Sequence, residues 1–363
     1  MNYSFLKINN LILLFFLFYI SLITGFVFDE NLNFGALPDW EAGDYPVIND
    51  LSLNFKETIL NYESYGHRHS PVYLIFLSLL KKFGFSFDSI RFINLNISLL
   101  LIFFFYKCLI IKFDKIEKSI LFLLSLSIFL SPTFRSLAIW PSSRLIGLIF
   151  FVISIYEFLK YLKTKKKKYV WKNLFFLIFS SYISPNFAVF IIFFVYHYWK
   201  NIELKYLFIL FFFCLFCSIP AFYYLFYLDI NFLLAKTPGL TSTETISLSF
   251  NFSNKILLIS SIIFFHLLPF MIDKKFLKDV IYTKKINYFL VIFLLIVNII
   301  FFNYSINYTG GGIFFQVSNV IFDNNIFFYI VTFFSLLVLI NFSAENLNNF
   351  LIFIILIISN IQN

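Results

Sequence analysis

The run LILLFFLFYISLITGFVF, residues 11–28, contains no charged side chain. A helix needs about 20 predominantly apolar residues to cross the hydrocarbon core of a bilayer. Comparable runs recur at 207–226 and 286–302. No A-x-A-like cleavage site follows the first run, so we expect an uncleaved membrane helix there rather than a secretory signal.

The composition of the whole chain agrees with these runs. Apolar residues make up 60% of the 363 positions and charged residues 13%, whereas soluble globular domains are about 45–50% apolar and about 25% charged. The net charge of +9 comes largely from basic residues in short loops between apolar runs. That placement indicates membrane topology rather than a nucleic-acid partner. The three cysteines lie in apolar runs without further ligands, so we expect no metal site at them.

Charge placement predicts the topology. Eleven ranges are predicted to span the membrane: 10–28, 89–111, 119–134, 143–161, 172–184, 186–199, 206–228, 254–272, 286–303, 326–342 and 349–361. With the N-terminus in the cytoplasm, this count puts the lysine-rich stretches, including Lys165–Lys168, on the cytoplasmic side. The loops 229–253 and 304–325 then lie outside.

The apolar stretch 71–80 is too short to cross the membrane and predicts an interfacial helix. The expected fold class is therefore all-α, a polytopic transmembrane helical bundle of about eleven spans. We expect a single transmembrane domain over 1–363. Within it, residues 29–88 form a long exterior loop that carries juxtamembrane helices and the catalytic groups.

Segment 29–70 is the most unusual part of the chain, because it holds eight of the nineteen acidic residues. Connections of this length are usually functional or disordered. Its interspersed aromatic side chains favour a folded surface over a mobile linker. Asp44 and Glu63, within this segment, are candidates for substrate binding.

Asp29 and Glu30 come directly after the first membrane helix. A carboxylate at the outer face of the membrane loses part of its hydration and becomes a stronger base. It would also lie near the headgroup of a lipid-borne substrate. The alternative is that the pair simply ends the helix and faces water.

Basic residues in two places could bind a phosphate. Arg68 and His69 lead into the interfacial helix, and Arg135 and Arg144 lie in a short exterior turn around Trp140. Arginine binds phosphate through paired N–H groups, and histidine can donate to it. The alternatives are a cationic membrane anchor for the first pair and ordinary interfacial placement for the second. Acids of the loop could also hold a divalent cation, although no spacing requires one.

Several short motifs occur in a familiar order. They are Phe28-Asp29-Glu30, His69-Ser70-Pro71-Val72-Tyr73-Leu74, Lys82-Phe83-Gly84, Ser89-Ile90-Arg91-Phe92-Ile93-Asn94 and Leu130-Ser131-Pro132. Over about residues 10–200 the chain resembles the GT-C superfamily of membrane glycosyltransferases. That superfamily includes the protein O-mannosyltransferases and the bacterial lipid A aminoarabinose and core-sugar transferases.

Two departures from the family pattern bear on the assignment. Ser70 stands where the family usually has the first of two prolines, and no match fixes the second catalytic carboxylate, for which Glu63 is the nearest candidate. Substrate and acceptor stay open for that reason.

The resemblance implies inverting transfer of a sugar from a polyprenyl-phosphate donor to a hydroxyl of a lipid, glycan or protein. It places the reaction on the exterior face of a membrane such as the bacterial inner membrane. Asp29 would be the general base and Glu30 its support. The lipid phosphate would be held by basic residues from this set: Arg68, His69, Arg135 and Arg144.

Three other functions are alternatives to glycosyl transfer. A flippase or transporter of lipid-linked glycans would normally carry ionisable groups near the middle of its spans, whereas here the acids crowd an exterior loop. A polysaccharide polymerase would be expected to use a large exterior loop later in the chain. A purely structural partner is the remaining alternative.

Overall fold

In a computed structural model, the structure describes residues 8–32, 36–67, 70–227, 248–268, 285–304 and 311–359. All regular elements in these ranges are helical, as the sequence predicts. The chain divides into two compact units, Met1–Pro238 and Gly239–Asn363, which are described separately. The expectation of a single domain stays a prediction.

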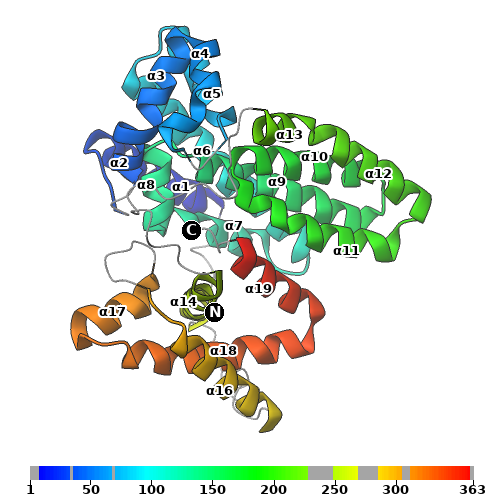
Figure 1. Cartoon of the computed structure of the whole chain (residues 1–363). Helices are drawn as coiled ribbons and strands as arrows, with labels where there is room; N and C mark the ends of the chain where they lie inside the picture. Colours follow the sequence, from blue (N-terminus) through cyan, green and yellow to red (C-terminus); the bar gives the residue numbers. More distant parts are fainter. Residues whose placement is uncertain are drawn as a thin grey trace. The chain divides into compact units, whose positions relative to one another are not determined.

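The first unit contains two groups of helices, one inside the predicted exterior loop 29–88 and one outside it (Figure 1). The group outside the loop, with two 3₁₀ turns between its helices, consists of α1 (Ile8–Val27), α6 (Phe87–Lys112), α7 (Lys118–Leu126), the 3₁₀ turn Ser127–Leu130, α8 (Pro132–Ile139), α9 (Ser143–Thr164), α10 (Lys168–Ile183), the 3₁₀ turn Pro185–Phe190, α11 (Ile191–Asn201), α12 (Leu204–Cys217) and α13 (Ile219–Phe226). The predicted exterior loop holds α2 (Ala36–Pro38), the π-helical segment Asp39–Asp44, α3 (Tyr45–Leu53), α4 (Phe55–Leu60), the 3₁₀ turn Tyr62–Tyr65 and α5 (Val72–Lys82).

Four described helical segments are long and apolar enough to cross a membrane: Asn9–Val27, Phe87–Lys112, Ser143–Thr164 and Leu204–Tyr224. A fifth is added if Lys118–Leu130 and Pro132–Ile139, bent by 69°, count as one broken span. These helices mark the chain as a multi-pass integral membrane protein. Shorter apolar helices occupy further predicted ranges, so the count of eleven spans stays a prediction.

The long helices differ in how much of their apolar surface other helices cover. α9 lies in the interior of the first unit, whereas α12 leaves a row of phenylalanines exposed, among them Phe208, Phe211, Phe212 and Phe216. An exposed apolar stripe of this size is suited to lipid and not to water. The exposed face of α12 therefore fits a membrane helix at the edge of the unit.

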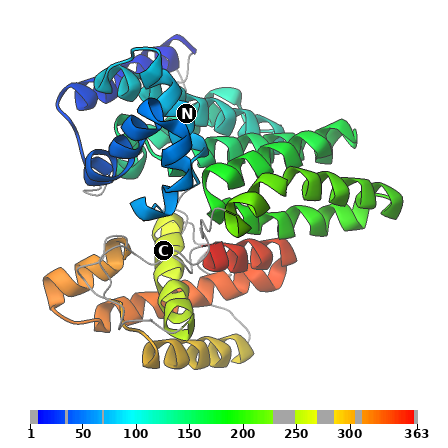
Figure 2. The same ribbon diagram turned by 45° about the horizontal axis from the view of Figure 1, so that its top comes forward.

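The predicted exterior loop is folded. α3 packs against α5, and the two helices lie side by side in Figure 2. Trp40, Ile48, Tyr62 and Tyr73 are fully or almost fully buried between them and their neighbours. The helix expected at 71–80 is present as α5, and its position at the membrane interface stays a prediction.

A buried amide joins three helices beside this loop. The Asn94 side chain on α6 accepts a 2.7 Å hydrogen bond from the Tyr73 hydroxyl of α5. It donates to the carbonyls of Leu137 and Ala138 in α8 at 3.1 and 2.7 Å. Because unpaired polar groups are costly in a dry interior, this amide fixes the positions of α5, α6 and α8.

We expect Asn94→Leu to lower the free energy of unfolding by about 2–4 kcal/mol, since it leaves the Tyr73 hydroxyl and two carbonyls without this partner. Thermal unfolding in detergent measures the change. Asn201→Leu is the matched control, because Asn201 is exposed and bonds only the His197 carbonyl of its own helix. Equal loss in both variants would contradict the role of Asn94.

A second polar contact ties α9 to α10 and α11. The Asn173 amide donates to the Ser154 carbonyl at 2.9 Å and accepts from the Tyr198 hydroxyl at 2.7 Å. Nearby, the Ser180 hydroxyl donates to the Gly147 carbonyl at 2.7 Å. A β-carbon at Gly147 would lie 2.8 Å from the Ser184 side chain, so the absence of a side chain permits this close packing.

The second unit contains α14 (Leu248–Leu267), α16 (Lys285–Ile300), α17 (Gly312–Phe322), α18 (Ile326–Glu345) and α19 (Leu347–Ser359). Its core is built around Phe315 and Phe328, whose rings are in edge contact. The Asn254 and Asn303 side chains are hydrogen-bonded at 2.8 Å. α17 lies within 304–325, which the topology predicts to be an exterior loop.

Candidate functional site

The candidate site begins where α1 ends. Asp29 has a φ of +52°, a left-handed conformation that costs a residue other than glycine about 1–2 kcal/mol. The turn is closed by the Glu30 amide, which donates to the Gly25 carbonyl at 2.8 Å. Backbone strain of this kind concentrates at functional sites, and here it turns the two carboxylates out of the helix direction.

Asp29 is held by an arginine from a distant helix. Arg91 of α6 donates through Nη2 to Asp29 Oδ1 at 2.6 Å and through Nη1 to Asp88 Oδ1 at 3.0 Å. The Arg91 side chain is 4% exposed, whereas that of Asp29 is 61% exposed. One side of the Asp29 carboxylate is therefore fixed and the other remains open to solvent.

Glu30 is held differently. Arg135 of α8 contacts both of its carboxylate oxygens, Nε to Oε1 and Nη2 to Oε2, each at 2.6 Å. Arg135 also donates to the Ser21 hydroxyl and carbonyl on α1, at 3.2 and 3.1 Å. Because both side chains are less than one fifth exposed, this bidentate pair fastens α1 to α8.

Gly25 makes room for the Glu30–Arg135 pair. A β-carbon at this position would lie 2.5 Å from Glu30 Oε2 and 3.1 Å from Arg135 Nη2. The close approach of the carboxylate to α1 thus requires glycine here.

Trp140 completes the support beneath the pair. Its indole N–H donates to the Glu30 carbonyl at 3.0 Å, and the Arg91 guanidinium lies 3.7 Å from its ring centroid. Trp140 is 2% exposed. The predicted turn is largely helical: Arg135 lies on helix α8, which the Ser131 hydroxyl caps, and Trp140 is buried. Its exterior position stays a prediction.

A second polar cluster lies in the loop. Asp44 Oδ1 is 3.4 Å from His67 Nδ1, and both side chains are largely buried. The Tyr62 ring stacks on the His67 ring with centroids 5.8 Å apart. Asp44 ends the π-helical segment Asp39–Asp44, and π-helical turns occur frequently at functional sites.

Aromatic side chains connect the two clusters. The Arg91 guanidinium lies 5.5 Å from the ring centroid of Phe87. Phe87 in turn contacts Tyr45, the residue after Asp44, with centroids 4.7 Å apart. A series of aromatic contacts therefore runs from Arg91 to Tyr45, the neighbour of Asp44 in the chain.

Burial shifts the pKa values of Asp44 and His67 in the second cluster. Burial, with a contribution from Asp39, raises the pKa of Asp44 to about 7, although Arg144 opposes this. Burial lowers the pKa of His67. At neutral pH the histidine is thus mainly neutral, while the Asp44 carboxyl titrates close to neutrality.

We expect Asp44 to make the folded protein less stable as pH rises. The folded chain binds the Asp44 proton more tightly than the unfolded chain, so its contribution to the free energy of unfolding falls between about pH 4 and pH 7. A pKa change from 3.8 to about 7 corresponds to at most about 4 kcal/mol. His67 acts in the opposite direction, adding stability as pH rises towards about 6.5.

Melting temperatures of wild type and Asp44→Asn between pH 4.5 and 7.5 test this expectation. The variant should gain stability relative to wild type as pH rises. Asp114→Asn, at a carboxylate that is 64% exposed, is the control and should follow the wild-type curve. Parallel curves for Asp44→Asn and wild type would contradict a raised pKa at Asp44.

The other predicted residues fall in different places. Glu63 is exposed in the 3₁₀ turn Tyr62–Tyr65, and Arg144 is exposed at the start of α9, within electrostatic reach of Asp44. No carboxylate of the described residues lies within 4 Å of the Arg144 guanidinium. Arg68 and His69 lie outside the described residues. In the described part of the chain, no three His, Cys, Asp or Glu side chains gather as metal ligands would.

Sequence reasoning missed Arg91 and His67 as site residues. Arg91 had a usable signal, because a charged residue inside a membrane helix is by default a functional candidate. His67 is adjacent to two residues that were selected, but nothing local connects it with Asp44, 23 positions earlier in the chain.

No protein-family model matches the chain, and neither the curated proteins nor the solved structures contain a significant match to it.

Proposed function

We propose that the chain is an inverting glycosyltransferase that moves a sugar from a polyprenyl-phosphate donor to a hydroxyl of a lipid, glycan or protein. The observation that carries this proposal is the state of Asp29. Its carboxylate follows a membrane helix directly, is fixed on one side by a buried arginine, and is largely exposed on the other. Fixed position together with an open face is what a general base requires.

The proposed reaction is a single displacement. Asp29 takes the proton of the acceptor hydroxyl while the hydroxyl oxygen attacks the anomeric carbon. The bond between that carbon and the phosphate oxygen breaks, and its electron pair leaves with the lipid phosphate. Attack opposite the leaving group inverts the anomeric configuration. Glu30, engaged by Arg135 through both oxygens, acts by holding the turn that presents Asp29.

Arg144 is the described arginine best placed to stabilise the departing phosphate. Arg91 and Arg135 are already paired with carboxylates, whereas Arg144 is exposed and has none within 4 Å among the described residues. Positive charge near the leaving oxygen lowers the barrier to its departure. By resemblance, Arg68 and His69 would add to this charge.

The second cluster would serve the acceptor. The Asp44 carboxyl, whose pKa burial raises to about 7, can give or take a proton near neutral pH beside the His67 ring. Aromatic contacts run from Arg91 through Phe87 to Tyr45, the residue after Asp44. Aromatic faces bordered by carboxyl groups suit a sugar, which has both apolar C–H faces and hydroxyl edges. Glu63, exposed nearby in the chain, is a further candidate for this role.

An apolar groove on the first unit would accommodate the donor's lipid chain. It has a volume of about 360 Å³ and is lined by side chains of α10, α12 and α13, including Phe179, Phe216 and Pro220. Tyr182 also lines it, and its carbonyl accepts a hydrogen bond from Ser70 of the first loop. The groove therefore adjoins the loop that carries the proposed phosphate-binding residues.

The proposal includes an orientation. With eleven spans and a cytoplasmic N-terminus, the loop 29–88 faces the exterior, and the lysine-rich turns face the cytoplasm. A bacterial inner membrane, with the site facing the periplasm, is the membrane that the resemblance suggests.

A transfer assay in proteoliposomes tests the proposal. The purified chain is incubated with a panel of labelled polyprenyl-phosphate sugars and with lipid, glycan and peptide acceptors. The expected result is a labelled product with inverted anomeric configuration. If a folded preparation transfers no sugar but moves the labelled donor between leaflets, the flippase alternative replaces the proposal.

A further inference from the structure

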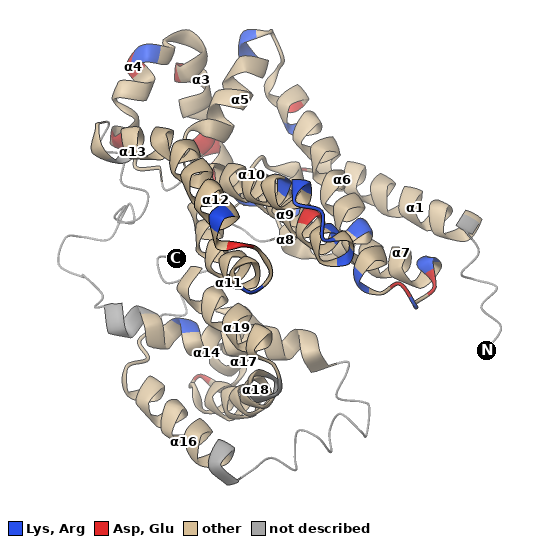
Figure 3. Cartoon of the chain, turned by 90° about the vertical axis from the view of Figure 1, so that its right-hand side faces the viewer, with Lys and Arg blue, Asp and Glu red and all other residues tan. Residues whose placement is uncertain are grey.

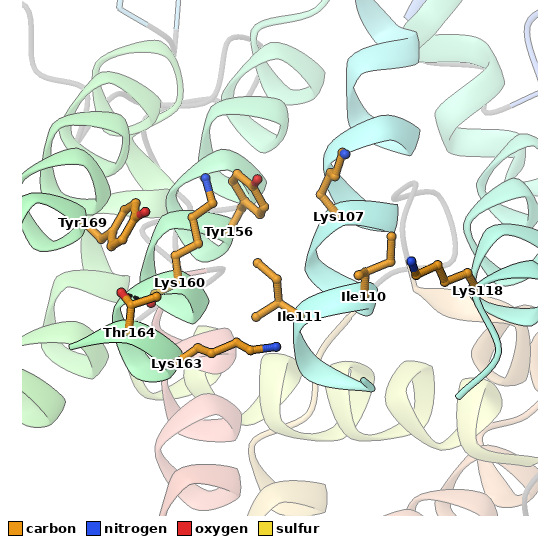
Figure 4. A pocket seen from close by; sticks show the side chains of 9 residues that line it. All are labelled: Lys107, Ile110, Ile111, Lys118, Tyr156, Lys160, Lys163, Thr164 and Tyr169. Carbon is orange, nitrogen blue, oxygen red and sulfur yellow. Dashed lines mark hydrogen bonds between the residues drawn. The ribbon is translucent and has the colours of Figure 1, made fainter. Parts of the chain in front are cut away.

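A pocket of about 460 Å³ lies between the ends of α6, α7, α9 and α10 (Figure 4). Four of its lining residues are lysines: Lys107, Lys118, Lys160 and Lys163. Figure 4 shows them on both sides of the pocket, with the Lys118 and Lys163 side chains extending towards it from opposite sides. Two tyrosines, two isoleucines and Thr164 complete the lining, so charged groups and apolar surface meet in one hollow.

The positive charge of the pocket is only partly neutralised. Lys160 is 3.5 Å from the Glu157 carboxylate, and Lys163 is 4.0 Å from that of Asp114. In the described ranges, Lys107 and Lys118 have no carboxylate within 4 Å. Four cations facing two carboxylates leave an excess of two positive charges. An anionic ligand would offset it.

The pocket lies far along α6 from Arg91 and far along α9 from Arg144. On α6, Arg91 and Lys107 are sixteen residues apart, and the same interval separates Arg144 from Lys160 on α9. At 1.5 Å per residue, each interval covers about 24 Å of helix, which approaches the roughly 30 Å thickness of the hydrocarbon core. In a membrane that α6 and α9 cross, this separation would put the pocket near the headgroups on the side opposite to Arg91 and Arg144.

Basic residues gather around this pocket and not only within it. Figure 3 shows Lys and Arg concentrated at the α6–α7 and α9–α10 turns, where Lys112, Lys115 and Lys165–Lys168 lie. Such turns attract anionic lipid surfaces in general. The pocket differs from them because its four lysines line one hollow beside Ile110 and Ile111.

We propose that this pocket binds the phosphate headgroup of an anionic phospholipid, with the start of its acyl chains against Ile110 and Ile111. Lysine ammonium groups are compact point charges that bind phosphate without demanding one fixed geometry. The Lys160 ammonium also lies 4.0 Å from the Tyr156 ring centroid, which helps to hold it at the pocket wall. The site is independent of sugar transfer and does not rest on the proposed function.

Binding of a chain-labelled fluorescent phosphatidylglycerol to the purified full chain in zwitterionic detergent tests the proposal. We expect K107Q/K118Q to weaken binding about 30-fold, because each lysine near an anionic headgroup contributes about a fivefold factor. The matched control is K165Q/K166Q, which removes two exposed lysines of the adjacent turn that do not line the pocket. The K165Q/K166Q variant should bind phosphatidylglycerol within about threefold of wild type. Neither the wild type nor the variants should bind phosphatidylcholine.

Two outcomes would overturn the proposal. Equal weakening by the two variant pairs would show general surface attraction without a pocket. Displacement of the labelled lipid by millimolar inorganic phosphate, equally well as by unlabelled phosphatidylglycerol, would identify a free-phosphate site instead. Lys107 is half-buried and Lys118 exposed, so neither change removes a buried core contact, and melting temperatures confirm that the variants are folded.

Discussion

Asp29→Asn is expected to lower the rate of sugar transfer by about 100-fold or more, in line with the loss of a general base. Asparagine has nearly the same shape and tolerates the left-handed backbone that Asp29 adopts. The turn after α1 should therefore survive the change. Initial rates at saturating donor and acceptor measure the effect on the chemical step.

Asp88→Asn is the matched control for this variant. Asp88 is the other carboxylate partner of Arg91, and its side chain is 71% exposed. Both variants remove one partner of the same buried guanidinium, but only one removes the proposed base. We expect Asp88→Asn to keep the transfer rate within about fivefold of wild type. Equal rates for Asp29→Asn and wild type would exclude Asp29 as the base and direct attention to Asp44.

Arg135→Leu is expected to lower the free energy of unfolding by about 3–5 kcal/mol, because it leaves the Glu30 carboxylate mostly buried without its cation. Removing that charge as well, in Glu30→Gln with Arg135→Leu, should restore most of the lost stability. Chemical unfolding in mixed micelles measures both variants. A double variant as unstable as the single one would contradict this account of the pair.

Arg144→Leu provides the contrast. Arg144 is exposed and has no carboxylate within 4 Å among the described residues. We therefore expect Arg144→Leu to change the free energy of unfolding by no more than about 0.5 kcal/mol. If Arg144 binds the donor phosphate, the variant should instead raise the KM for the donor, by about tenfold for one lost charge-assisted contact. Together the two variants test a structural role for Arg135 and a donor-binding role for Arg144, nine positions further along the chain.

Several features of the molecule followed from local sequence. The apolar runs located the helices, and the shortness of 71–80 indicated a helix distinct from the spans, which is α5. The Asp29–Glu30 pair was selected because it follows an apolar run directly. All of these signals lie within about 20 consecutive residues, which is the scale on which hydropathy reports.

The partners of the acidic pair could not be predicted in this way. Arg91 and Arg135 are 62 and 105 positions away from Asp29 and Glu30 respectively. Such pairings depend on how helices pack, which no local periodicity encodes. For the same reason the packing of Trp140 under Arg91, which buries its ring, could not be predicted.

Hydropathy also could not predict the lengths of the helices. Range 119–134 is predominantly apolar and uncharged, but Pro132 begins a new helix bent by 69° from the preceding one. Pro185 likewise begins a 3₁₀ turn between α10 and α11. Proline lacks the N–H that a continuing helix needs, so an apolar run can contain two short helices.

The Glu30–Arg135 pair also has a consequence for how the protein is made. The ribosome releases α1 into the membrane about 105 residues before α8 emerges, a delay of about 5–20 s at ordinary elongation rates. During that interval Glu30 has no cation, and the first helix must stay hydrated at that end or be held by the insertion machinery. Translation stalled before residue 132 should therefore leave α1 open to extraction or cleavage, and synthesis of α8 should close that window.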